Sequence, residues 1–139
     1  MDIITQNEKE TAEIGKSLAN QLAPGTILAL FGDLGSGKTT FVKGLASGLG
    51  IEKHVTSPTF NIVKVYPVSS GRIKRLVHVD AYRLNSDKDA ESVGLLEILA
   101  DPDTLTVIEW PEKIMELIEE KIKEIHFTFI DEMKRKISS

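Results

Sequence analysis

The chain has 139 residues, of which 41% are hydrophobic and 27% charged, a composition typical of globular proteins. The length suits one domain over residues 1–139 and is too short for two. Its formal net charge of −4 argues against a free-standing nucleic-acid binder, and the lack of a long apolar run excludes a membrane-spanning helix. Cysteine is absent, which excludes disulfides and thiolate metal sites, and with no secretory signal in view we expect a cytoplasmic protein.

The first predicted element is a helix over residues 8–22, with apolar side chains on one stripe. Asn7, with Glu10 three residues later, resembles a capping box that starts this helix. A Pro-Gly turn follows, and the apolar residues 26–31 then predict a buried strand.

The strand leads into Gly32-Asp33-Leu34-Gly35-Ser36-Gly37-Lys38-Thr39, which matches the P-loop pattern G-x-x-x-x-G-K-[ST] without a mismatch. Apolar residues after it recur at helical spacing until Gly48 and Gly50, where a helix would stop. A strand, a glycine-rich loop and a helix are the context that this motif requires. The sequence therefore predicts a site for a nucleotide's phosphates at this loop.

Each part of the motif has a chemical reason. Glycines leave backbone N–H groups free to surround phosphate oxygens, and the N-terminal end of the following helix favours an anion. Lys38 can reach the β- and γ-phosphates, and the Thr39 hydroxyl can ligate Mg²⁺. We expect the nucleotide's phosphates to be held by Asp33, Leu34, Gly35, Ser36, Gly37, Lys38, Thr39 and Thr40.

The rest of the chain alternates between strand and helix patterns. We expect a loop over residues 54–59, a hairpin of strands 60–66 and 73–80, and a helix over 87–100 that is broken at Gly94. A short buried strand (105–108), a helix from Pro111 to about residue 121, a strand (124–130) and an added edge strand from Met133 complete the chain. This order predicts an α/β fold: a P-loop NTPase domain with a mixed central β-sheet and flanking helices.

Two of these strands end in a carboxylate, and ligands of open α/β sheets bind at such ends. Glu109 follows a wholly apolar run and could hold Mg²⁺ or orient the attacking water. Asp80 could complete the Mg²⁺ shell, activate water, or cap the turn after it. Trp110 could stack beside the site or fill the core, and Arg83 could contact phosphate or a partner. The three histidines have no metal-ligand spacing, so we expect structural roles for them.

Four motifs in order, GDLGSGKTT, TSPTF, HVDAYRL and VIEWPEK, closely resemble the bacterial TsaE (YjeE) family over nearly the whole chain. The resemblance implies a P-loop ATPase that binds ATP or ADP with Mg²⁺, hydrolyses ATP slowly and serves threonylcarbamoyladenosine modification of tRNA. It implies a TsaB–TsaD complex as protein partner, which transfers the threonylcarbamoyl group to the adenosine next to the anticodon. Contact with tRNA would be indirect, through that complex, and no membrane would be involved.

The resemblance also implies roles for individual residues. Lys38 and the loop amides would hold phosphates, Thr39 and Glu109 would serve the metal, and Lys38, Glu109 and Asp80 would be the catalytic groups. Residues 56–59 would form a switch loop, and Trp110 would lie beside the nucleotide. An adenine pocket between the first helix and the C-terminal strand would use Glu8 or Thr11 together with Arg135.

Two other function classes stay open on the sequence. A small-molecule P-loop kinase would close an arginine-bearing lid over the transferred phosphate, and residues 87–101 contain no arginine. A nucleotide-regulated RNA-binding module would need a basic face with interleaved aromatic residues, and the acidic balance counts against it.

Overall fold

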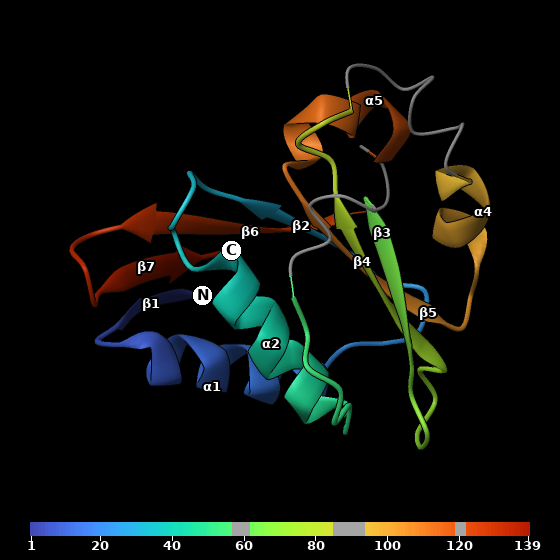
Figure 1. Cartoon of the computed structure of the whole chain (residues 1–139), viewed down its shortest axis with the longest axis horizontal. Coiled ribbons are helices and arrows are strands. Elements are labelled where there is room, and N and C mark those ends of the chain that lie inside the picture. The colour runs from blue at the N-terminus through green and yellow to red at the C-terminus, as the bar shows by residue number, and fades with distance from the viewer. Residues whose placement is uncertain (57–61, 85–93, 119–121) are drawn as a thin grey trace.

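The computed structural model describes residues 1–56, 62–84, 94–118 and 122–139. Within these ranges, seven strands form one mixed sheet in the order β1-β7-β6-β2-β5-β4-β3 (Figure 1). The strands are β1 (Asp2–Thr5), β2 (Ile27–Phe31), β3 (Val63–Pro67), β4 (Arg75–Asp80), β5 (Thr104–Glu109), β6 (Ile122–Phe129) and β7 (Arg135–Ser138). The helices are α1 (Glu8–Ala19), α2 (Lys38–Gly48), α4 (Leu95–Ala100), the 3₁₀ turn η1 (Pro111–Ile114) and α5 (Met115–Ile118).

The centre of the sheet is parallel and its two sides are antiparallel. β2 pairs in parallel with β5 and β6, and β5 pairs in parallel with β4. β3 and β4 are antiparallel neighbours, as are β6 and β7, and β7 and β1. This arrangement confirms the predicted mixed α/β sheet and the hairpin between its third and fourth strands.

Helices cover both faces of the sheet, as Figure 1 shows, with α1 and α2 side by side on one face and α4 and α5 on the other. The first core packs beneath α1 and α2 and includes Leu30, Leu45, Leu76, Leu105 and Val107. The second lies on the other face and includes Ile27, Val77, Ile108, Ile114 and Ile118. Because neighbouring residues of a strand point to opposite faces, β4 and β5 contribute to both cores, as near-continuous apolar runs do in parallel sheets.

The N-terminus of α1 confirms the predicted capping. The Asn7 side chain accepts a hydrogen bond from the Glu10 backbone N–H at 2.9 Å, and the Glu10 carboxylate accepts one from the Gln6 N–H at 3.0 Å. The helix ends at Ala19, three residues before the predicted end, and Leu22 is still buried beyond it.

The prediction of an edge strand at the C-terminus was wrong. β7 lies inside the sheet, between β6 and β1, and the edge is β1, a strand that the sequence reading did not identify. β1 spans four residues ahead of the first helix, so its pattern is too short to be recognised without its partner. Pairing of β1 with β7 brings the two chain ends together, and the Ser139 N–H donates to the Met1 carbonyl at 2.9 Å.

Other boundaries agree in part. α4 begins directly after Gly94, where a break was expected, and the predicted helix upstream of it falls largely in residues 85–93, outside the described ranges. The helix expected from Pro111 starts as a 3₁₀ turn and continues as α5 to Ile118. None of the helices in the described part of the chain is long and apolar enough to cross a membrane.

Glycines allow α1 and α2 to approach closely. A Cβ built on Gly44 of α2 would lie 1.8 Å from the Ala12 carbonyl oxygen of α1, and one on Gly15 of α1 would lie 2.2 Å from the Phe41 carbonyl oxygen of α2. Both contacts are with backbone, which cannot move aside as a flexible side chain can. This close contact sets the position of α1 beside the helix that follows the P-loop.

Gly44→Ala should therefore destabilise the protein. In an open helix the same change stabilises by about 1 kcal/mol, but here the backbone clash should reverse the sign and cost about 1–3 kcal/mol of unfolding free energy. Ser47→Ala, at an exposed position of the same helix, is the control and should be neutral or slightly stabilising. Denaturant unfolding of both variants measures the difference, and a Gly44→Ala protein as stable as the control would contradict the close packing.

Candidate functional site

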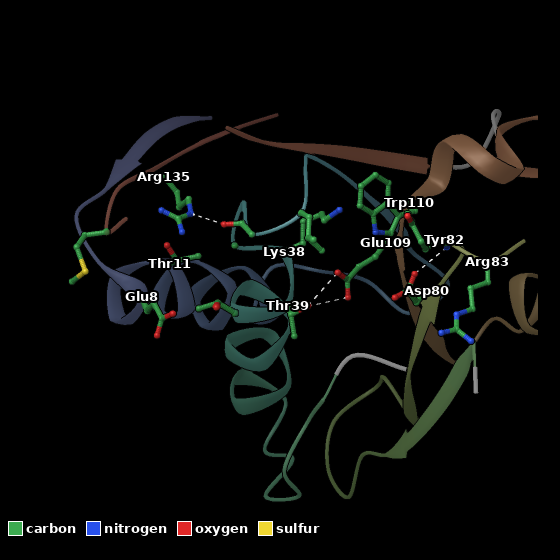
Figure 2. Close-up of a pocket in the computed structure, with 15 residues that line it drawn as sticks. Glu8, Thr11, Lys38, Thr39, Asp80, Tyr82, Arg83, Glu109, Trp110 and Arg135 are labelled. Atoms are coloured by element: carbon green, nitrogen blue, oxygen red, sulfur yellow. Dashed lines mark hydrogen bonds between the residues drawn. The ribbon is translucent and has the colours of Figure 1, made fainter. Parts of the chain in front are cut away.

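A cavity of about 680 Å³ opens where the carboxyl ends of β4 and β5 meet the N-terminus of α2. Figure 2 shows Thr11 and Arg135 at one end of it, Asp80, Tyr82 and Arg83 at the other, and Lys38, Thr39 and Glu109 between them. It is lined by Glu8, Thr11, Leu34, Gly35, Gly37, Lys38, Thr39, Thr40, Asp80, Tyr82, Arg83, Glu109, Trp110, Met133 and Arg135. Most of the predicted site residues are thus brought together by the fold.

The P-loop backbone is held in conformations that favour glycine. Gly35 and Gly37 have φ angles of 78° and 101°, and Gly37 precedes the first residue of α2. No side chain caps α2 at Gly37, so the first N–H groups of the helix have no side-chain partner there. A helix start of this kind, at the wall of a cavity, is suited to bind an anion.

Lys38 points from the first turn of α2 into the same region. Its side-chain nitrogen donates to the Gly32 carbonyl at 2.6 Å and lies 3.7 Å from the centroid of the Trp110 ring. The residue is buried, and this burial lowers the pKa of Lys38, whereas the negative charges of Glu109, Glu112 and Asp80 oppose the shift. A buried cation at the entrance to a helix N-terminus is suited to bind phosphate.

Glu109 and Asp80 end neighbouring parallel strands and are paired in the β4–β5 register. Both are buried, and they share the face of the sheet that packs on α2. The Thr39 hydroxyl lies 3.2 Å and 3.4 Å from the two Glu109 carboxylate oxygens, so the hydroxyl and carboxylate predicted to serve a metal do meet. Asp80 accepts a hydrogen bond from the Tyr82 N–H at 3.0 Å, which agrees with the turn-capping alternative for this residue.

Trp110 has left-handed backbone angles, with φ 59° and ψ 48°, in the residue directly after β5. This conformation is unusual for a residue with a side chain, and such strain is found mostly at functional sites. The indole lies beside Lys38 and makes an edge contact with Tyr82, whose ring centroid is 5.1 Å away. Trp110 therefore lines the site while also packing against the second core.

The other end of the cavity joins α1, the P-loop and β7. Arg135 donates through Nε to the Gly35 carbonyl at 3.2 Å and stacks on Phe129, 4.6 Å from the ring centroid. Thr11 is buried, and its hydroxyl forms a hydrogen bond with the Thr5 hydroxyl, 2.7 Å away. The methyl group of Thr11 therefore faces Gly37. Both residues line this end of the cavity, and Arg135 also contacts the P-loop through its bond to Gly35.

Three predicted site residues lie away from the cavity wall. Asp33 is exposed on the loop, and its carbonyl accepts from the Ser36 N–H at 3.1 Å. Ser36 is buried beneath the loop, and its hydroxyl has no hydrogen-bond partner within the described ranges. Thr56 accepts a hydrogen bond from Lys64 at 2.6 Å, and the remainder of the expected switch loop lies outside the described residues.

Other site residues were missed in the sequence. Met133, which belongs to no recognised motif, contributes apolar surface to the cavity together with Leu34, a residue that was predicted. His78, expected to be structural, lies within 2.5 Å of Glu109. The signal for His78 was its place two residues before Asp80 on a strand, which puts both side chains on one face.

The residues present fit a nucleotide with a divalent cation. A hydroxyl and carboxylates are the oxygen donors that Mg²⁺ prefers, and it is usually bound through one or two carboxylates together with substrate phosphates. Among the described residues, no group of three or more His, Cys, Asp or Glu side chains could hold a metal ion.

Comparison with known proteins identifies the family. The family model described as threonylcarbamoyl adenosine biosynthesis protein TsaE matches residues 5–137. The chain belongs to the TsaE family.

Curated members of the family are similar over most of their length. The TsaE protein of Treponema pallidum is 36% identical over 138 residues, covering 99% of this chain and 98% of the relative. That of Borreliella burgdorferi is 44% identical over 113 residues, covering 81% and 80%. The crystal structure of Bacillus subtilis YdiB superimposes with a TM-score of 0.70 at 33% identity, covering 99% of this chain and 82% of the other. Membership in the TsaE family places the chain in tRNA threonylcarbamoyladenosine biosynthesis.

The lowered pKa of Lys38 predicts a pH dependence of stability. Because the pKa in the folded protein lies below the ordinary value of 10.5, the unfolded chain binds more protons in the interval between the two values. The unfolding free energy of the wild type, relative to Lys38→Met, should therefore rise as the pH increases from the lowered pKa of the folded protein toward the ordinary lysine value of 10.5. Lys43→Met, which removes an exposed lysine of the same helix, controls for the loss of one charge. A relative stability that falls over this interval would contradict the burial of a charged Lys38.

Proposed function

We propose that this protein is a P-loop ATPase that binds ATP and ADP with Mg²⁺, hydrolyses ATP slowly and acts on the TsaB–TsaD complex in threonylcarbamoylation of tRNA. The observation that carries the proposal is the convergence of Lys38, the start of α2, Thr39 and Glu109 on one cavity. Membership in the TsaE family supports the pathway. A cytoplasmic location and indirect contact with tRNA, through TsaB–TsaD, are parts of the same proposal.

Binding would begin at the P-loop. Lys38 would exchange the Gly32 carbonyl and the indole of Trp110 for phosphate oxygens, and a phosphate would offset the cost of its burial. The free N–H groups at the start of α2 would contact the same phosphates. The base would extend toward Thr11 and Arg135, the end of the cavity farthest from Asp80 in Figure 2.

Hydrolysis adds water to the γ-phosphorus and releases ADP and phosphate. Mg²⁺ bound with the nucleotide would offset the charge that develops on the phosphate oxygens. Thr39 and Glu109 would hold the cation, and Glu109 or Asp80 would orient the attacking water. Which carboxylate orients the water stays open, because both end strands at the same point of the sheet.

Binding and hydrolysis should separate by mutation. Lys38→Ala should weaken ATP binding by about 10- to 100-fold, through loss of a charge-assisted contact. Glu109→Ala should keep the ADP binding that does not depend on Mg²⁺ but lower turnover by about 100-fold or more. Calorimetry measures affinity and phosphate release measures turnover, with Lys43→Ala as the control for charge. Unchanged affinity in Lys38→Ala would defeat the phosphate role, and full turnover in Glu109→Ala would assign the catalytic part to Asp80.

Purified TsaB–TsaD tests the partner and separates the proposal from a small-molecule kinase. The complex should retain this protein in a pull-down in a manner that depends on ATP, and it should raise the rate of ATP hydrolysis. Lys38→Ala should lose the dependence on ATP. Rapid phosphoryl transfer to a metabolite, with no response to TsaB–TsaD, would favour the kinase.

A further inference from the structure

His78 makes a hydrogen-bond contact that is not part of any role described so far. It lies on β4 with no exposed surface, and its Nε2 is 2.5 Å from Oε2 of Glu109, the carboxylate at the end of the neighbouring strand β5. In the parallel register His78 is opposite Val107, and Glu109 is the next residue along β5 that points to the same face. The contact is therefore set by the sheet and does not depend on a loop.

The other ring nitrogen shows how the imidazole is oriented. Nδ1 of His78 is buried and has no hydrogen-bond partner among the described residues. The carboxylate of Glu109 can only accept, so the N–H that faces it belongs on Nε2. His78 thus donates to Glu109 through Nε2.

This arrangement has a cost that packing alone does not explain. Leaving a buried polar atom unpaired is unfavourable, and a leucine at position 78 would fill similar space without that cost. Buried polar residues with an unpaired atom are expected mainly at functional sites. Among the residues that the structure describes, the hydrogen bond that His78 gains in return is the one to Glu109.

The bond completes the support of the Glu109 carboxylate. Thr39, at the start of α2, approaches this carboxylate from the helix side, and His78 approaches Oε2 from β4. Two donors on separate elements fix both the position and the plane of the carboxylate. With only one of them, the group could rotate about its terminal bond, which has a broad torsional preference.

We propose that His78 is a positioning residue, which holds the Glu109 carboxylate in the orientation that serves the nucleotide-bound cation. It acts through Glu109 and lines no part of the cavity. The inference rests on the proposed function, because it assigns to Glu109 the cation and the water of ATP hydrolysis. Residues that orient a metal ligand in this way usually change metal affinity or activity by about 10- to 100-fold when they are replaced.

Two substitutions separate the hydrogen bond from the packing. His78→Leu keeps the volume and removes the donor, whereas His78→Gln places an amide N–H near the position of Nε2. His126→Leu is the matched control, because His126 is half-exposed and stacks on Phe31. The nucleotide-free wild type should show the Nε2–H tautomer of His78 by imidazole NMR, with signals that shift in Glu109→Ala. An Nδ1–H tautomer, or signals that ignore Glu109→Ala, would overturn the inference without any assay of activity.

The Mg²⁺ dependence of ADP affinity and the kcat of ATP hydrolysis test the effect of His78 on function. His78→Leu should lose about 10-fold or more of the gain in ADP affinity that Mg²⁺ confers, and its kcat should fall about 10- to 100-fold. His78→Gln should restore most of both, and His126→Leu should match the wild type. Unchanged Mg²⁺ dependence in His78→Leu, or an equal loss in His78→Gln, would refute the positioning role.

The two proposals can fail separately. A wild type without ATP turnover would end the proposed hydrolysis, and the NMR signature and the Mg²⁺ dependence of ADP binding would still decide the role of His78. If His78→Leu does not fold, His78→Gln and the tautomer decide it.

Discussion

Parallel pairing of β4 with β5 and of β5 with β2 is the constraint on which the site depends. It brings the carboxyl ends of these strands to one edge of the sheet, where the P-loop leaves β2 and α2 begins. Asp80 and Glu109 are in register there, and Thr39 reaches Glu109 across the gap between sheet and helix. If the β4–β5 register shifted by one residue, the carboxylate of either Asp80 or Glu109 would point to the opposite face of the sheet, into the second core.

The second constraint is the close contact of α1 with α2. Backbone meets the glycines at positions 15 and 44, so α1 lies directly against the helix that carries Lys38 and Thr39. One end of the cavity is built on this contact, with Thr11 from α1 and Arg135 from β7 beside the P-loop. Pairing of β1 with β7 connects both of these elements to the rest of the sheet, so the two chain ends contribute to the same site.

The charged groups of the site are buried and depend on one another. Lys38 has a lowered pKa because of its burial, and the carboxylates of Glu109 and Asp80 partly oppose that shift. Glu109 is held by Thr39 and His78, and Lys38 by a carbonyl and an indole. Each of these groups therefore has a protein partner in the absence of a ligand, and a nucleotide bound as proposed would exchange contacts that already exist.

Much of this protein was determined by the sequence alone, because the signals are local. The P-loop, the buried strand before it, the helix after it and the carboxylates that end two apolar strands all follow from short patterns, and four ordered motifs indicated the TsaE family. The structure brings Lys38, Thr39, Asp80, Glu109, Trp110, Thr11 and Arg135 to one cavity, and their roles toward a nucleotide stay predictions.

Only the tertiary structure decided the rest, because it depends on pairs of residues far apart in the chain. β1 was missed and β7 was misplaced, since a four-residue strand is stabilised by its partners and not by its own pattern. The bond between His78 and Glu109 joins residues 31 positions apart and exists only in one register of two strands. No periodicity or motif specifies which strands become neighbours; burial of both faces of the sheet does.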